Sequence, residues 1–134
     1  MGDLKFVGTS VKRVDGVKKV TGSLKYVDDI KLSKMLYVAV KRSPHPHAKI
    51  LNINFEKALA IKGVKDIITG DLFTKRGGLY LEDKNFLAVG KVRYRGEAVV
   101  AVCAISEEIA QSALEFIDIE YEVLPAVTNA KDAM

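Results

Sequence analysis

Residues 97–123, EAVVAVCAISEEIAQSALEFIDIEYEV, decide the fold of this 134-residue chain. Residues 97–105 form its most apolar run, and the length of this run suits a buried central strand. Ser106 and the two glutamates after it are typical of a helix N-terminus, where a hydroxyl caps backbone N–H groups and acids oppose the dipole. Residues 117–123 alternate apolar and acidic side chains, which predicts a strand with one buried face. The order strand–helix–strand predicts a βαβ unit with a right-handed crossover.

The same stretch supplies the expected core. Apolar side chains on the inward faces of these elements should pack against one another. The residues that we expect to be mostly buried are Val99, Val100, Val102, Ile109, Leu114, Ile117, Ile119 and Tyr121. Cys103 lies within the apolar run, so we expect a buried thiol that reacts slowly and has no catalytic role.

Shorter elements are predicted upstream. They are a strand over residues 35–41 with Leu36, Val38 and Val40 on one face, a strand over 49–53 with Leu51 and Ile53 inward, a short helix from Asn54 to Ile61 and a strand over 64–69. Residues 1–23 are basic and punctuated by glycine, which indicates an extended N-terminal arm, and residues 72–95 are rich in loops. Together these patterns predict the α+β class, with a mixed sheet and two main helices.

Length and composition fit one domain over residues 1–134, because domains commonly hold about 100–150 residues. Apolar residues make up 49% of the chain and charged residues 28%, which is typical of a folded protein and not of a disordered one. We find no run of 18 apolar residues and no apolar core of a secretory signal, so we expect no membrane span and no export. A single cysteine excludes an internal disulfide and favours a cytoplasmic location.

Charge is distributed unevenly along the chain. Residues 1–49 carry eleven basic and four acidic side chains, whereas residues 96–134 carry one basic and eight acidic side chains. Such asymmetry can indicate binding to nucleic acid, or surfaces of opposite sign that meet protein partners. The basic residues form no continuous run and no aromatic-interleaved RNA-binding motif accompanies them, so solvated faces explain most of this charge. A small basic nucleic-acid-binding protein remains the alternative function.

Few residue patterns in the chain offer chemistry. His45 and His47 are its two histidines and lie in a proline-flanked loop, where they could bind zinc only with a third ligand. A metal-binding module built on them is a further alternative. Asp28 and Asp29 pair two carboxylates, but a magnesium site would need a phosphate or more carboxylates. The chain has no P-loop and no GxGxxG motif. We therefore predict no catalytic, cofactor-binding or metal-binding residue within it.

Seven segments together carry a family resemblance. They are Arg13-Val14-Asp15, Lys19-Val20-Thr21-Gly22, Tyr26-Val27-Asp28-Asp29-Ile30, Arg42-Ser43-Pro44-His45-Pro46-His47-Ala48-Lys49-Ile50, Gly63-Val64, Val92-Arg93-Tyr94-Arg95-Gly96-Glu97 and Tyr121-Glu122-Val123-Leu124-Pro125-Ala126-Val127. In their order and spacing, residues 10–133 resemble the N-terminal domain of the large, molybdopterin-binding subunit of the xanthine dehydrogenase/aldehyde oxidase/carbon monoxide dehydrogenase family. Ala98 stands where this family often has proline, which a strand position explains. The fold that the resemblance implies is the α/β hammerhead.

The resemblance implies part of a molybdenum-dependent oxidoreductase. In this family the large subunit binds a molybdenum–pterin cofactor and oxidises an aldehyde, a purine-like heterocycle or carbon monoxide, and electrons leave through iron–sulfur clusters and flavin. The cofactor-binding segments and the catalytic glutamate of such subunits follow the domain that this chain resembles. We therefore expect a structural, docking domain that is not catalytic alone. The implied partners are the remainder of the molybdopterin-binding subunit and the iron–sulfur and FAD subunits, not nucleic acid or a membrane. The proline-rich loop over 42–47 and exposed apolar residues would form its docking surface.

Overall fold

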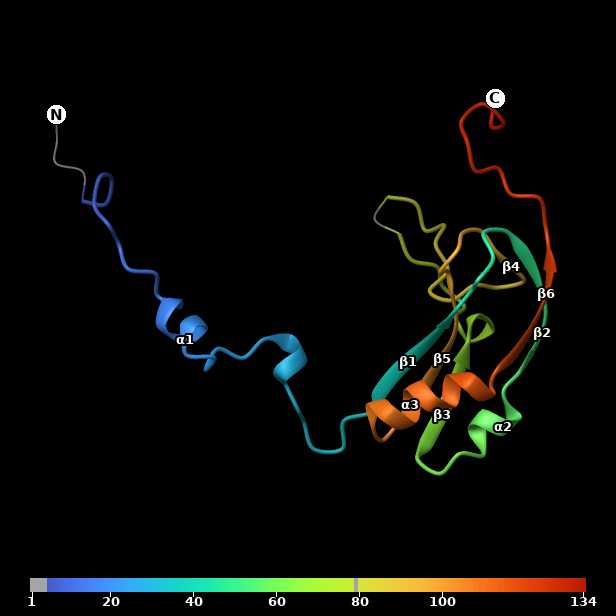
Figure 1. The fold of residues 1–134 in the computed structure, drawn as a ribbon, viewed down its shortest axis with the longest axis horizontal. Coiled ribbons are helices and arrows are strands. Elements are labelled where there is room, and N and C mark those ends of the chain that lie inside the picture. The colour runs from blue at the N-terminus through green and yellow to red at the C-terminus, as the bar shows by residue number, and fades with distance from the viewer. Residues whose placement is uncertain (1–4, 79) are drawn as a thin grey trace. The chain divides into compact units, whose positions relative to one another are not determined.

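The structure of the chain, a computed structural model, describes residues 5–78 and 80–134. The chain divides between Ser33 and Lys34 into two compact units. In Figure 1 the first unit is coloured blue to cyan, and the second runs from cyan to red. Each unit has its own secondary structure.

The first unit holds helix α1 (Gly16–Val20) and a 3-10 helix (Val27–Asp29). The second unit holds, in chain order, β1 (Tyr37–Arg42), β2 (Ala48–Asn54), α2 (Glu56–Leu59), β3 (Val64–Thr69), a 3-10 helix (Gly70–Leu72), β4 (Lys91–Val92), β5 (Ala98–Ala104), α3 (Glu107–Ala113), a 3-10 helix (Leu114–Phe116) and β6 (Asp118–Val123).

Helix α1 is a short helix within the segment that was expected to be extended. Asp15 precedes it, and its carboxylate lies 2.8 Å from the Lys19 ammonium and 2.6 Å from the Arg13 guanidinium. These contacts hold the pKa of Asp15 below its usual value. Lys18 and Lys19 lie in the last turn, where positive charge complements the helix dipole. The large apolar side chains of this unit are exposed; they include Phe6, Val7, Val11, Val14, Val17, Val20, Tyr26, Val27, Ile30 and Leu32.

The second unit contains two three-stranded sheets, with strand orders β1-β5-β3 and β4-β2-β6 (Figure 1). This arrangement confirms the predicted α+β class. The predicted mixed sheet is wrong, because the strands of both sheets pair antiparallel. The predicted βαβ unit is also wrong, since β5 and β6 belong to different sheets and α3 connects the two. Periodicity identifies a strand and its buried face, but it does not identify the strand's partner.

Helix α3 covers one face of the sheet β1-β5-β3 (Figure 1). Ala39 of β1, Ala104 of β5 and Ala110 of α3 are buried together at this contact. Their small side chains allow the helix to approach the sheet closely. The Lys41 ammonium of β1 donates to the carbonyl oxygen of Leu114, 2.7 Å away, at the end of α3.

Several local predictions are confirmed. The predicted strand over residues 64–69 is β3, and the apolar run contains β5. The Ser106 hydroxyl accepts a hydrogen bond from the backbone N–H of Ile109, at 3.3 Å, as an N-cap does.

The predicted helix from Asn54 to Ile61 is present but shorter, because α2 covers only Glu56–Leu59. Its N-cap is Phe55, and Asn54 is the last residue of β2. The Asn54 side chain still accepts from the backbone N–H of Glu56, at 3.2 Å, where α2 begins.

Strand β2 contains a register shift that the sequence did not reveal. Its pairing with β6 skips Leu51, which lies between Ile50 and Asn52. Such a bulge re-aims the side chains on either side of the extra residue. Ile50 and Ile53 consequently both pack against the core, whereas Leu51 is 55% exposed. The prediction that Leu51 faces inward is therefore wrong, and that for Ile53 is confirmed.

The predicted core residues lie in or against the core. Four are fully buried, namely Val99, Val100, Val102 and Ile117. Four more are partly buried and pack against the buried clusters, namely Ile109, Leu114, Ile119 and Tyr121. The prediction that Cys103 is buried is wrong: its side chain is half-buried, because it lies on the sheet face opposite to α3.

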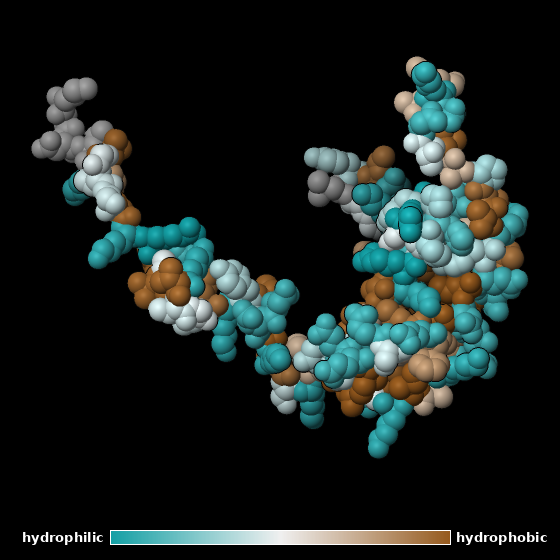
Figure 2. Space-filling model, viewed as in Figure 1, coloured by the Kyte–Doolittle hydropathy of each residue, from teal (hydrophilic) through white to brown (hydrophobic). Residues whose placement is uncertain are grey.

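Apolar side chains also remain on the surface of the second unit. Figure 2 shows hydrophobic residues among hydrophilic ones on the face that it draws. The large ones include Leu36, Val38, Leu51, Leu59, Leu72, Phe73, Tyr94, Ile105, Phe116 and Val123. Within the described residues, no helix is long and apolar enough to cross a membrane.

Candidate functional site

The loop between β1 and β2 is bonded to the turn that precedes β5. Ser43 N–H donates to the Glu97 carbonyl oxygen at 2.9 Å, and Gly96 N–H donates to the Ser43 carbonyl oxygen at 2.8 Å. The Arg42 guanidinium also donates to the Gly96 carbonyl oxygen, at 3.0 Å. Gly96 has a φ of 90°, in the left-handed region that favours glycine. These bonds fix the proline-rich loop, whose two prolines already restrict its conformations.

Both histidines attach this loop to β6 and the segment after it. The His45 imidazole packs edge-on against the ring of Tyr121, with centroids 5.1 Å apart. Nδ1 of His47 lies 2.7 Å from the carbonyl oxygen of Pro125, and Leu124 N–H donates to the His47 carbonyl oxygen at 2.9 Å. Each histidine thus makes a contact within the fold. Nowhere in residues 5–78 and 80–134 do three His, Cys, Asp or Glu side chains gather as metal ligands would.

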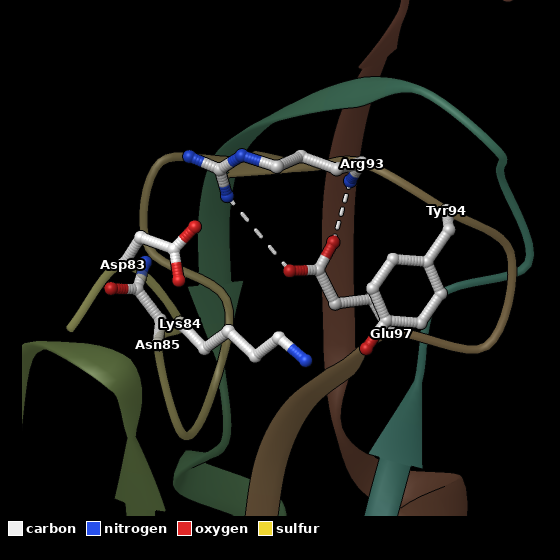
Figure 3. Close-up of a pocket in the computed structure, with 6 residues that line it drawn as sticks. All are labelled: Asp83, Lys84, Asn85, Arg93, Tyr94 and Glu97. Atoms are coloured by element: carbon white, nitrogen blue, oxygen red, sulfur yellow. Dashed lines mark hydrogen bonds and ion pairs between the residues drawn. The ribbon is translucent and has the colours of Figure 1, made fainter. Parts of the chain in front are cut away.

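A cavity of about 420 Å³ lies beside the same turn (Figure 3). The residues that line it are Asp83, Lys84, Asn85, Arg93, Tyr94 and Glu97. Glu97 is 8% exposed, and its carboxylate accepts a hydrogen bond from the backbone N–H of Arg93 at 2.5 Å. The Arg93 guanidinium lies 3.9 Å from the same carboxylate. The Glu97 carboxylate is thus bonded within its own turn.

A second, more basic hollow of about 380 Å³ brings three chain segments together at the surface. The residues that line it are Pro46, His47, Arg93, Tyr94, Arg95, Ala126, Val127 and Thr128. Arg93 and Arg95 are exposed there, and the described residues that line the hollow include no aspartate or glutamate. A surface of this charge suits an acidic surface of a protein partner, since complementary charges orient an interface.

The other candidate residues of the sequence are two aspartates of the first unit and one cysteine of the second. Asp29 accepts through its carboxylate from the backbone N–H of Tyr26, at 3.0 Å, at the start of a 3-10 helix in the first unit. Its neighbour Asp28 is exposed in the same helix. Cys103 lies in β5 of the second unit, on the side of the sheet away from α3.

The two hollows were not predicted from the sequence. The residues that line the first hollow come from the stretch over 83–97, where neither hydrophobic periodicity nor a chemical motif is present. The second hollow adds residues of the proline-rich loop and of the segment after β6, which lie far from that stretch in the sequence. The available signal was the segment from Arg93 to Glu97, whose order contributed to the family resemblance. That segment forms the turn before β5, but its sequence does not indicate which side chains surround a cavity.

Tyr121 provides a test of packing behind the histidine loop. Its hydroxyl is buried and has no hydrogen-bond partner among the described residues. We expect Tyr121→Phe to raise the free energy of unfolding at neutral pH by about 1 kcal/mol, because it removes an unsatisfied polar group. Urea denaturation measures this change. A loss of stability in the variant would show instead that the hydroxyl is satisfied in solution.

The same variant has a predictable pH dependence. Burial raises the pKa of the Tyr121 phenol above its usual 10.0. As pH rises past 10.0, the unfolded chain ionises first, so the wild-type protein loses stability there. The stability difference between Tyr121→Phe and the wild-type protein should therefore be constant near neutral pH and grow in the alkaline range.

Comparisons with known proteins agree on one family. Residues 21–125 match the family described as aldehyde oxidase and xanthine dehydrogenase, a/b hammerhead domain. The chain is 40% identical over 124 residues to a probable xanthine dehydrogenase component of Bacillus subtilis (strain 168), which is 91% of this chain and 17% of that protein. It is 34% identical to the nicotinate dehydrogenase large molybdopterin subunit of Eubacterium barkeri, over 98% of this chain and 32% of that subunit. The crystal structure of quinoline 2-oxidoreductase from Pseudomonas putida 86 matches 98% of this chain and 18% of its own, with a TM-score of 0.90 and 38% identity.

These matches extend over both sheets and over the loop and turn described above. The chain spans from 17% to 32% of the length of the two relatives named. The resemblance and the hammerhead fold predicted from the sequence are confirmed. The chain belongs to the aldehyde oxidase and xanthine dehydrogenase family of a/b hammerhead domains.

Proposed function

We propose that this chain is the structural, docking domain of the large subunit of a molybdenum-dependent oxidoreductase. The observation that carries the proposal is the pair of coverages in the quinoline 2-oxidoreductase match: 98% of this chain corresponds to 18% of that chain. Nearly all of this chain therefore corresponds to a small part of the much longer quinoline 2-oxidoreductase polypeptide. The oxidised substrate would be an aldehyde, a purine-like heterocycle or carbon monoxide.

The described residues favour docking over catalysis. They bring together no metal-ligating cluster, and the buried carboxylate of Glu97 is bonded to the backbone of its own turn. The name of the nicotinate dehydrogenase relative implies a molybdopterin cofactor for a complete subunit. We propose that the cofactor is held by other parts of the large subunit.

The proposed partners are the remainder of the molybdopterin-binding subunit and the iron–sulfur and FAD subunits or domains of the complex. The basic hollow at Arg93 and Arg95 supports an acidic protein surface as one contact. Residues 1–134 would act as a single hammerhead domain with residues 1–23 as its arm, which the 98% coverage of this chain supports. A cytoplasmic location is proposed from the single free cysteine.

The test is purification in two forms. The 134-residue chain is produced alone, and in parallel the native assembly is purified from its source cells through a tag on this chain. We expect the native assembly to contain stoichiometric molybdenum by elemental analysis and to reduce a dye with an aldehyde, purine or carbon monoxide. The chain alone should contain no stoichiometric molybdenum and show no turnover, because under this proposal the cofactor is held by other parts of the large subunit.

Two results would contradict this proposal. Stoichiometric molybdenum or turnover in the chain alone would show that the domain carries its own active site. A native assembly without molybdenum, or a tagged chain that purifies with nucleic acid, would show that the chain serves another function. Nucleic-acid binding would be recognised by a steep loss of affinity with added salt.

A further inference from the structure

The sheet β1-β5-β3 has one face covered by α3 and a second face that is less well covered. On the covered face, Ala39, Val102 and Ala104 are buried. Cross-strand partners in a sheet share a face, so the register of the strands defines which residues lie opposite. Figure 1 shows α3 in front of these strands, and the second face is turned away from that helix.

Two rows of cross-strand partners form this second face. Val38, Cys103 and Asp66 make one row, and Val40, Ala101 and Ile68 make the next. We call these six residues the open face. Five of them are apolar or weakly polar, and Asp66 is the charged one.

The open face is partly accessible in this chain. Val38 is 59% exposed and Asp66 is exposed, whereas Val40, Ile68 and Cys103 are half-buried and Ala101 is buried. Leu36 and Ile105, which flank β1 and β5 and continue the same alternation, are also exposed. A contiguous apolar surface on a regular sheet indicates a contact surface, since a monomer gains stability by covering it.

We propose that the open face is the surface on which the remainder of the large subunit packs. The inference rests on the function proposed above. The length of the related chains identifies the occupant: the matching domain is 18% of the quinoline 2-oxidoreductase chain and 17% of the Bacillus relative. A polypeptide about five times longer supplies a large apolar surface within the same molecule or complex. The partner surface would be apolar, with a basic side chain opposite Asp66.

Cys103 reports directly on this contact, because it is the chain's one cysteine and lies in the middle strand of the open face. The measurement is the rate at which a maleimide labels Cys103, followed by mass spectrometry of its peptide. It is made on the native assembly, purified through the tag, and on the 134-residue chain. Because packing removes access to the thiol, we expect labelling in the native assembly to be slower by about tenfold or more.

A matched pair of substitutions tests the surface independently. Val38→Asp places a charge on the open face, and Leu51→Asp places one on the other sheet at a side chain that is similarly exposed, 59% against 55%. In the native assembly, Val38→Asp should reduce the molybdenum-containing protein that purifies with the tagged chain by about tenfold, because a buried unpaired charge opposes packing. Leu51→Asp should leave the yield near that of the wild-type chain.

The outcomes separate this proposal from the one on which it rests. Equal labelling of Cys103 in both preparations, or equal losses in the two variants, overturns the open face as the contact while the assembly still contains molybdenum. A native assembly without molybdenum overturns the proposed function and this inference together. A dimer of the isolated chain that Val38→Asp dissociates, with Cys103 unprotected in the assembly, would assign the open face to a second copy and also overturns the inference.

Discussion

Ile117→Ala is expected to lower the free energy of unfolding by about 2–5 kcal/mol. Ile117 is 1% exposed and lies immediately before β6, in the core cluster that also contains Val102 and Val92. Truncation of its side chain removes buried methyl and methylene groups and leaves a cavity that the surrounding strands fill only in part. Chemical denaturation of the 134-residue chain measures the loss.

The control for this prediction is Val123→Ala at the other end of β6. Val123 is 61% exposed, so its truncation should change stability by no more than about 0.5 kcal/mol. If Ile117→Ala were as mild as this control, the two sheets would not share the core described above. The prediction therefore tests the packing of the second unit and not only one side chain.

Local structure was largely predictable from the sequence. The apolar run that became β5, the alternation in β6 and the Ser106 cap each depend on neighbours within a few residues. Strand partners were not predictable in this way. The chain was expected to form a βαβ unit because β5, α3 and β6 follow one another, yet β6 pairs with β2 and β5 pairs with β1 and β3. Those pairings depend on contacts between distant segments, which periodicity does not encode.

The two wrong predictions about single residues have a common physical cause. Leu51 and Cys103 were both assigned to the core because they are apolar residues in apolar strands. A bulge turns Leu51 outward, and the covering of only one sheet face by α3 leaves Cys103 half-buried. In each case hydrophobicity identified a strand residue whose side chain is more stable when it is shielded from water. It could not show whether the cover comes from this chain or from a partner.

The proline-rich loop illustrates what the sequence showed about function. His45 and His47 could have indicated a metal, and only the fold shows that they contact Tyr121 and Pro125. The segments that carry the family resemblance include Arg42–Ile50, which forms the proline-rich loop and the start of β2. These segments build the connection between β1, β2 and β5. The residues that carried the resemblance therefore hold the loop that we propose for docking.

Glu97 connects that loop to the stability of the domain. Its carboxylate accepts from the Arg93 N–H at 2.5 Å, and its backbone carbonyl accepts from Ser43 at 2.9 Å. Glu97→Ala removes the carboxylate and leaves a partly buried N–H without its acceptor. We expect a loss of about 1.5–3 kcal/mol in the free energy of unfolding, which is typical of hydrogen bonds to charged groups. Hydrogen exchange at the Arg93 amide should become faster, because that bond protects it.

Glu97→Gln is the matched variant, since it keeps the shape and a carbonyl acceptor while removing the charge. The hydrogen bond to Arg93 N–H can persist in this variant, so we expect a smaller loss, about 1 kcal/mol, and near-normal protection of that amide. The ion pair with the Arg93 guanidinium contributes little to the difference, because its groups are 3.9 Å apart and that guanidinium is largely exposed. Equal losses in the two variants would show that charge, and not the acceptor, stabilises the turn. Without the acceptor, the turn would no longer hold Ser43 and the proline-rich loop in place for a partner, so Glu97→Ala should also weaken assembly more than Glu97→Gln does.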